Sequence, residues 1–207
     1  MTDFPRRGLY LITPDGEDTR QLLRQVAQVL PFAACLQYRN KRADAVQRLA
    51  EAAALRELCT AHGVCFIVND DVWLAQEVAA DGVHLGKGDG SLQVARELLG
   101  ANASIGISCY DDAARAREAA AEGADYVAFG AVFASATKPG ARAASLKLFA
   151  ETMDIDVPKV AIGGITPDNA HQVAAAGADL IAVIAGVFAA DSPVDAARRC
   201  AAVFGSL

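Results

Sequence analysis

The chain has 207 residues with a formal net charge of −6, and 53% of the residues are hydrophobic. This composition is typical of a globular protein, and we expect one domain spanning residues 1–207. The acidic balance excludes a general nucleic-acid binder, because such proteins need an excess of Lys and Arg. No apolar run approaches the ~18 residues of a membrane span, and the N-terminal apolar run is too short for a signal peptide, so no membrane partner is expected.

Apolar runs of strand length alternate with helical patterns along the whole chain. The runs are rich in Val, Ile and Leu, which is typical of parallel strands covered by helices. Eight strand–helix units of about 26 residues predict an α/β fold, a (β/α)8 (TIM) barrel, and the count favours it over the alternative, a doubly wound open sheet. The expected strands are 9–13, 32–39, 66–68, 82–85, 103–108, 125–130, 159–162 and 179–184, and the expected helices are 17–30, 44–62, 72–79, 111–122, one from 145, 166–176 and 191–204.

The five cysteines form an odd set without a CxxC pair. Cys35 and Cys65 lie inside strand-like runs. This pattern predicts buried free thiols in a reducing cytosol, and therefore a cytoplasmic protein.

Two strands run directly into carboxylates, at Asp70 and at Asp89. Neighbouring parallel strands lie only about 4.8 Å apart, so these two side chains are expected to meet over one hard cation, which prefers oxygen ligands. The alternative is that Asp70 or Asp71 caps the helix expected from residue 72. For Asp71 the cap is the favoured interpretation, and for Asp70 with Asp89 we favour the shared metal.

The second strand ends in Gln37, Arg39 and Lys41, which alternate and therefore share one face. At the mouth of a barrel this face would present two cations and an amide, and the alternative is a pair of solvated loop charges. Tyr10, His84 and Ser108 lie in the first, fourth and fifth expected strands. Each is either a core or capping residue or part of the pocket.

Three later loops carry the pattern of anion sites. The long segment after the sixth strand contains Ser135, Thr137 and Lys138 among small residues, and it is either an anion-binding lid or a surface loop. The seventh and eighth strands end in Gly163-Gly164 and Ile184-Ala185-Gly186, where backbone N–H groups bind phosphate in many barrels of this type. We therefore expect two anion sites, the second at these turns and the first around the metal with Arg39, Lys41, Asn69 and Lys138.

Eight sequence segments together resemble the thiamine phosphate synthase family over nearly the whole chain. That resemblance implies a Mg²⁺-dependent (β/α)8 barrel. Its members join hydroxymethylpyrimidine pyrophosphate to hydroxyethylthiazole phosphate, and they release pyrophosphate. The segments are GLYLIT at 8–13, LQYRNK at 36–41, IVNDD at 67–71, DGVHLG at 81–86 with Asp89, IGIS at 105–108, GAVFASATKP at 130–139, VAIGGITPDNA at 160–170 and GADLIAVIAGVF at 177–188.

The resemblance also implies roles for individual residues. Two aspartates would bind Mg²⁺, one set would hold the pyrimidine pyrophosphate, and another would hold the thiazole phosphate. Ser108, Arg39 and Lys138 would take part in catalysis. The metal pair is Asp70 and Asp89, the pyrimidine set is Gln37, Arg39, Lys41, Asn69, Ser108 and Lys138, and the thiazole set is Ser135, Thr137, Gly164, Ile184 and Ala185.

At some positions the residue differs from the one that is usual in the family. Asp71 replaces a common arginine, Ser135 a common threonine and Ala185 a common serine, while Lys87 places a cation beside Asp89 that competes with Mg²⁺. Two alternative functions are a thiazole tautomerase-like isomerase, which carries histidine where this chain has Ala131, and a phosphate-ester-binding barrel without catalysis. A homo-oligomer is compatible with each.

Overall fold

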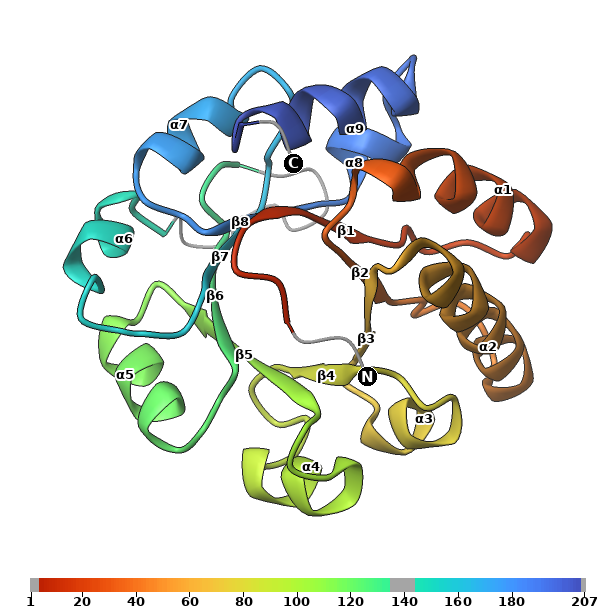
Figure 1. Cartoon of the computed structure of the whole chain (residues 1–207), viewed down its shortest axis with the longest axis horizontal. Coiled ribbons are helices and arrows are strands. Elements are labelled where there is room, and N and C mark those ends of the chain that lie inside the picture. The colour runs from red at the N-terminus through yellow and green to blue at the C-terminus, as the bar shows by residue number, and fades with distance from the viewer. Residues whose placement is uncertain (1–3, 135–143, 206–207) are drawn as a thin grey trace.

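Eight parallel strands close into a barrel in chain order, and β1 pairs with β8. The computed structural model describes residues 4–134 and 144–205. The closed ring confirms the predicted barrel, and the open doubly wound sheet is wrong (Figure 1). The strands are β1 (Gly8–Ile12), β2 (Cys35–Tyr38), β3 (Cys65–Asn69), β4 (Gly82–Leu85), β5 (Ser104–Tyr110), β6 (Tyr126–Gly130), β7 (Lys159–Ile162) and β8 (Leu180–Val183).

Helices follow the strands and surround the ring on its outside (Figure 1). Aspartate or serine side chains cap the first turn of several of them, which satisfies backbone N–H groups that have no partner within the helix. The helices are α1 (Thr19–Val29), the 3-10 helix η1 (Leu30–Phe32), α2 (Ala45–His62), α3 (Val72–Glu77), α4 (Leu92–Leu99), α5 (Ala113–Ala121), α6 (Lys147–Glu151), α7 (Ala170–Ala175), α8 (Ala185–Phe188) and α9 (Pro193–Ala202).

Most boundaries differ from the predicted ones by a few residues, and two larger differences have a local cause. Phe32 belongs to η1 rather than to a strand, because Pro31 fixes a φ angle that suits the start of a helical turn. The predicted helix 166–176 is shorter: Pro167 to Asn169 form a turn, and regular helix begins at Ala170. No range was predicted for α4 after β4, and the short helix α8 after β8 was not predicted at all.

Alternation along the strands separates two apolar layers. Residues such as Leu11 and Phe66 point outward and pack under the helices, whereas Tyr10, Ile67 and Tyr126 form a second cluster inside the ring. The inner cluster fills the barrel below the carboxyl ends of the strands, as in other barrels of this type. The functional side chains therefore have to lie at those carboxyl ends, above the cluster.

The opposite end of the barrel is covered by the segment before β1. The Phe4 ring stacks on the Tyr126 ring at 3.8 Å between centroids and 5° between planes, and it meets the edge of Tyr10 at 6.0 Å. In Figure 1 this segment, drawn in red, lies within the ring of strands. Phe4 thus covers the inner cluster at the amino-terminal end of the barrel.

All five cysteines are buried free thiols, as predicted. Within residues 4–134 and 144–205, no helix combines the length and apolar character needed to cross a membrane.

Candidate active site

A cavity of about 310 Å³ opens between the ends of β2 and β3. Its wall brings together four residues that the sequence predicts for anion and metal binding, Arg39, Lys41, Asn69 and Asp70. The remaining lining residues are Tyr38, Asn40, Ala43, Arg48, Val68, Asp71 and Leu74.

Asn40 shapes the loop that carries the two cations. Its side-chain oxygen accepts hydrogen bonds from the backbone N–H groups of Arg42 and Ala43 at 3.1 and 3.3 Å, and its amide nitrogen donates to Gly16 O at 2.8 Å. An asparagine that bonds to the backbone two and three residues later makes a tight turn. Asn40 is 6% exposed, and sequence reasoning missed it although it stands between Arg39 and Lys41.

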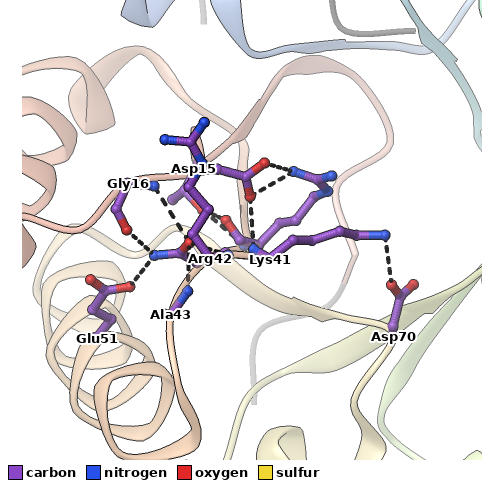
Figure 2. Close-up of polar contacts among 10 residues, drawn as sticks. Asp15, Gly16, Lys41, Arg42, Ala43, Glu51 and Asp70 are labelled. Carbon is purple, nitrogen blue, oxygen red and sulfur yellow. Dashed lines mark hydrogen bonds and ion pairs between the residues drawn. The ribbon is translucent and has the colours of Figure 1, made fainter.

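Asp15, also missed, holds the cation-bearing loop from the β1 side. Both oxygens of its carboxylate accept hydrogen bonds from one guanidinium nitrogen of Arg39, each at 2.9 Å. One of these oxygens also accepts a hydrogen bond from the Lys41 backbone N–H at 2.8 Å (Figure 2). Partial burial acts to raise the pKa of Asp15, but these bonds outweigh it and lower the pKa below the usual value. Because β2 ends at Tyr38, Arg39 and Lys41 are loop residues rather than strand residues. Asp15 holds the Arg39 guanidinium and the Lys41 backbone, whereas the Lys41 ammonium lies 3.8 Å from Asp70.

Glu51 on α2 supports this loop from inside the protein. Its carboxylate is 1% exposed and accepts a hydrogen bond at 2.8 Å from Tyr38 on β2 and one at 3.0 Å from the Asn40 amide. Thr19 on α1 and Gln47 on α2 each donate at 2.9 Å. Burial acts to raise the pKa of Glu51, but the four donors outweigh it and lower the pKa. One buried carboxylate therefore ties two helices to the end of β2.

Asp70 and Asp89 are brought together across the neighbouring strand ends. The Asp70 backbone has a φ of 63°, a left-handed conformation that aspartate tolerates, and its N–H donates to His84 O at 2.8 Å. Asp89 accepts the Gly86 N–H at 2.9 Å. Burial and then the neighbouring Asp89 carboxyl raise the pKa of Asp70, while Lys41, 3.8 Å away, acts to lower it.

The oxygen donors of this pair fit a magnesium ion. Mg²⁺ is commonly held by one or two carboxylates together with water and substrate phosphates, and two adjacent carboxyl groups need a positive charge between them. Among the residues that the structure describes, no group of three or more His, Cys, Asp or Glu side chains could hold a metal, so the pair would need phosphate oxygens to complete a coordination shell. Asp71 has another task, because it caps α3 by accepting the Leu74 N–H at 2.9 Å, as predicted.

A chain of hydrogen bonds crosses the barrel just below this end. Gln37 Nε2 donates to the Tyr10 hydroxyl at 2.8 Å, and the Tyr10 and Tyr126 hydroxyls are 2.8 Å apart. His84 Nδ1 lies 3.1 Å from the Tyr126 hydroxyl, and His84 Nε2 lies 2.9 Å from Ser108 Oγ. Five strands contribute one group each. Tyr126 was not among the predicted site residues, although it alternates with Ala128 on the inner face of β6.

The environment of His84 makes the protein sensitive to acid. Burial lowers the pKa of His84 to about 4, although Asp89 acts to raise it. In the unfolded chain the pKa is about 6.5, so the unfolded state takes up a proton first as the pH falls. Between pH 7 and 5 this uptake should lower the free energy of unfolding by about 2 kcal/mol.

Urea unfolding of the metal-free protein at pH 7, 6 and 5 measures that loss. His84→Gln removes the titrating group, and its stability should fall by about 2 kcal/mol less over the same range. Identical pH profiles for the two proteins would contradict the depressed pKa. His62→Gln, at an exposed helix end, is the control.

The turns after β7 and β8 lie side by side, because these strands are neighbours in register. Gly164 has a φ of 63°, and a Cβ there would lie 2.5 Å from Ala134 O. Asn169 fixes the turn by donating to Gly164 O at 2.9 Å and accepting the Thr166 N–H at 2.8 Å. Ile184 and Ala185 form the start of α8. The structure thus places the predicted turn at Gly164 beside the one at Ile184 and Ala185. Ser135, Thr137 and Lys138 lie outside the described residues.

Comparison with known proteins identifies the family. The profile described as thiamine monophosphate synthase matches residues 9–187. The chain belongs to the thiamine monophosphate synthase family. It is 58% identical over 198 residues to the thiamine-phosphate synthase of Xanthomonas campestris pv. campestris, and 58% identical over 200 residues to that of Azoarcus sp.. These alignments cover 96% of this chain and 96% and 97% of the two relatives.

A solved structure supports the same family assignment. The thiamine phosphate pyrophosphorylase of Pyrococcus furiosus superposes on the chain with a TM-score of 0.84 and 34% sequence identity, and 96% of each chain is covered. The family assignment therefore covers the barrel as a whole, including the strand ends that carry the site.

Proposed function

We propose that the cavity between β2 and β3 binds the pyrophosphate of a hydroxymethylpyrimidine substrate, and that the turns after β7 and β8 bind the phosphate of a thiazole substrate. The activity is thiamine-phosphate synthesis, a group transfer. The carbon–oxygen bond between the pyrimidine methylene and pyrophosphate breaks, and a carbon–nitrogen bond to the thiazole nitrogen forms. The observation that carries the placement is the shared wall of Arg39, Lys41, Asn69 and Asp70 around one cavity.

Departure of pyrophosphate is the step that these residues would assist. The aminopyrimidine ring can support positive charge on its methylene carbon, so the main requirement is to stabilise the negative charge of the leaving group. Arg39 and Lys41 would supply positive charge at the cavity wall, where Asp15 holds the Arg39 guanidinium and Asn40 shapes the loop that carries both. Groups held in place before the reaction stabilise developing charge without reorganisation. Lys138 would add a third cation.

Asp70 and Asp89 would hold Mg²⁺, which when bound would neutralise charge on the pyrophosphate oxygens. Gln37 and Ser108 would hold the pyrimidine from the barrel side, and Gly164, Ile184, Ala185, Ser135 and Thr137 would hold the thiazole phosphate. With both rings held, the thiazole nitrogen lies ready to capture the methylene carbon, so that a reaction between two molecules proceeds as if within one.

The direct test is incubation of the purified chain with both phosphorylated halves and Mg²⁺. We expect thiamine phosphate and pyrophosphate to form in equal amounts. Either half-substrate alone should give no thiamine phosphate. Isomerisation of a thiazole without joining of the two halves would instead favour the tautomerase-like activity, and binding without turnover would indicate a non-catalytic barrel.

The two anion sites should be separable by mutation. Arg39→Ala should weaken binding of the pyrimidine pyrophosphate by about tenfold or more and leave thiazole phosphate binding within twofold, because one charge-assisted contact contributes about 1.5–3 kcal/mol. Gly164→Ala should do the reverse, since the added Cβ would meet Ala134 O and shift the turn. Calorimetry with each half-substrate measures both.

Each variant has a matched control. Arg42→Ala removes an exposed arginine from the same loop that does not line the cavity. Gly123→Ala places alanine at another positive φ, 96°, with no atom within 4 Å of the added Cβ. If Arg39→Ala and Gly164→Ala each lowered the affinity for both ligands equally, the assignment of two separate anion sites would be wrong.

A further inference from the structure

The contact between His84 and Ser108 has the appearance of a nucleophile beside its base. His84 Nε2 is 2.9 Å from Ser108 Oγ, which is the spacing found where a histidine takes a proton from a serine. Which of the two atoms donates depends on which ring nitrogen of His84 carries a proton. The hydrogen bonds on the other side of the ring decide that question.

Counting the protons along this chain of hydrogen bonds shows that each group donates in the same direction, from Gln37 towards His84. The Gln37 amide nitrogen can only donate, so the Tyr10 hydroxyl accepts from it and must place its own single proton elsewhere. Among the described residues, the Tyr126 hydroxyl, 2.8 Å away, is the strong acceptor within reach, and the nearby Cys35 thiol is only a weak one. The Tyr126 hydroxyl accepts from Tyr10 and donates its own single proton to its other partner, His84 Nδ1.

Both tyrosine hydroxyls are shielded from solvent, so neither donates its proton to bulk water instead. Tyr10 is 1% exposed and Tyr126 is fully buried, with Phe4 stacked on its ring. Burial of the Tyr126 ring depends on Gly106, because a Cβ there would lie 1.9 Å from the ring. His84 Nδ1 therefore accepts, and the proton of the imidazole lies on Nε2, where it points at Ser108 Oγ.

We propose that Gln37, Tyr10, Tyr126 and His84 form a relay of fixed direction that makes Ser108 a hydrogen-bond donor to the pyrimidine substrate, and that excludes it as a nucleophile or base. Ser108 Oγ accepts from His84, and apart from His84 it has no hydrogen-bond partner among the described residues. Its own proton is thus directed to an acceptor atom of the substrate. This inference rests on the proposed function, which places Ser108 beside the pyrimidine.

The relay has two physical effects on Ser108. It fixes the rotation of the hydroxyl, which otherwise turns freely, and each hydrogen bond in a chain polarises the next, so Ser108 becomes a stronger donor. Tyr10, Tyr126 and His84 act through Ser108 and are positioning residues. The direction also requires that the Gln37 nitrogen faces Tyr10, which leaves its amide oxygen as the acceptor available to the pyrimidine.

The tautomer of His84 can be measured without any substrate. Nitrogen-15 NMR of the histidine-labelled protein, free of metal and ligand, reports which ring nitrogen carries the proton. The chain has three histidines, and His84→Gln identifies the signals of His84 by their loss. We expect the proton on Nε2. A proton on Nδ1 overturns the relay, whatever the outcome of the synthesis assay.

A second spectrum tests the origin of that preference. Tyr126→Phe removes the donor to Nδ1, and the Nδ1 signal should shift towards that of a nitrogen without a hydrogen bond. Tyr110→Phe is the control, because the Tyr110 hydroxyl accepts from the Lys87 N–H and lies outside the relay. An unchanged Nδ1 signal in Tyr126→Phe would contradict the chain of donors.

Kinetics show whether the relay acts through Ser108. His84→Leu removes both contacts and should lower kcat on the order of tenfold or more, with KM for both substrates within about twofold. His84→Gln keeps an N–H donor for Ser108 and an oxygen acceptor for Tyr126, and it should restore most of kcat. In a Ser108→Ala background, His84→Leu should cost nothing further.

The outcomes of these experiments are distinguishable. Additive losses in the double variant, or a loss confined to KM, would overturn the positioning role. Melting temperatures identify a variant that fails to fold, and the tautomer measurement on the unmodified protein then still decides the direction of the relay. Failure to form thiamine phosphate with the Nε2 tautomer present would count against the proposed function and not against the relay.

Discussion

Asp89→Asn and Asp70→Asn are each expected to lower turnover by roughly 10²-fold or more, because charge stabilisation at a leaving group contributes that much in comparable sites. Asparagine keeps the size of the side chain and an oxygen that accepts the Gly86 N–H, so Asp89→Asn should remain folded. Burial and then the neighbouring Asp89 carboxyl raise the pKa of Asp70, so both disfavour its charged form, and loss of one charge should not destabilise the protein.

Steady-state rates across a range of Mg²⁺ concentrations measure the effect. The concentration of Mg²⁺ for half-maximal activity should rise in both variants, and excess Mg²⁺ should restore part of the rate. Asp191→Asn, at an exposed position before α9, is the control and should behave like the unmodified protein. Unmodified activity of either variant at limiting Mg²⁺ would contradict the shared metal.

Glu51→Ala is expected to lower the free energy of unfolding by about 4 kcal/mol, since it leaves buried donors without their charged acceptor. Tyr38 and Asn40 lose that partner at the end of β2, and Thr19 and Gln47 lose it on the two helices. Because Asn40 orders the loop of Arg39 and Lys41, affinity for the pyrimidine pyrophosphate should fall as well, while affinity for the thiazole phosphate should change less.

Urea unfolding at pH 7 and calorimetry with each half-substrate test this pair of effects. The pKa of Glu51 is lowered in the folded protein, so its contribution is present at pH 7 and is lost only as the pH falls through the folded value. Glu57→Ala, an exposed glutamate on the same helix, should change stability by about 0.5 kcal/mol or less. A similarly small change in Glu51→Ala would show that the four hydrogen bonds contribute little to the free energy of unfolding.

The barrel could be predicted from the sequence because each unit carries its own local signals. Short Val- and Ile-rich runs and helix caps such as Asp44 and Asp71 repeat along the chain, and the topology of parallel strands then leaves few arrangements. The inner face of β2 followed from alternation, and Gln37 lies inside the ring as expected. Alternation stopped at Tyr38, however, and the positions of Arg39 and Lys41 depend on Asp15, more than twenty residues away in sequence.

The groups that hold the site in place were the ones that sequence reasoning missed. Glu51 looks like one more charge on an amphipathic helix, and only the packing of α1 and α2 on β2 shows that it is buried. Tyr126 looks like the first residue of a core strand, and its partners come from β1 and β4. Such contacts join segments far apart in sequence, and a single chain without its fold carries no local signal for them.

Phe4, stacked on Tyr126, covers the inner cluster of the barrel from its amino-terminal side. Under the proposed function, both substrates would enter, and pyrophosphate and thiamine phosphate would leave, through the mouth formed by the loops after the strands. The same arrangement would limit hydrolysis, because a second substrate bound at the mouth would stand between bulk water and the reactive methylene carbon.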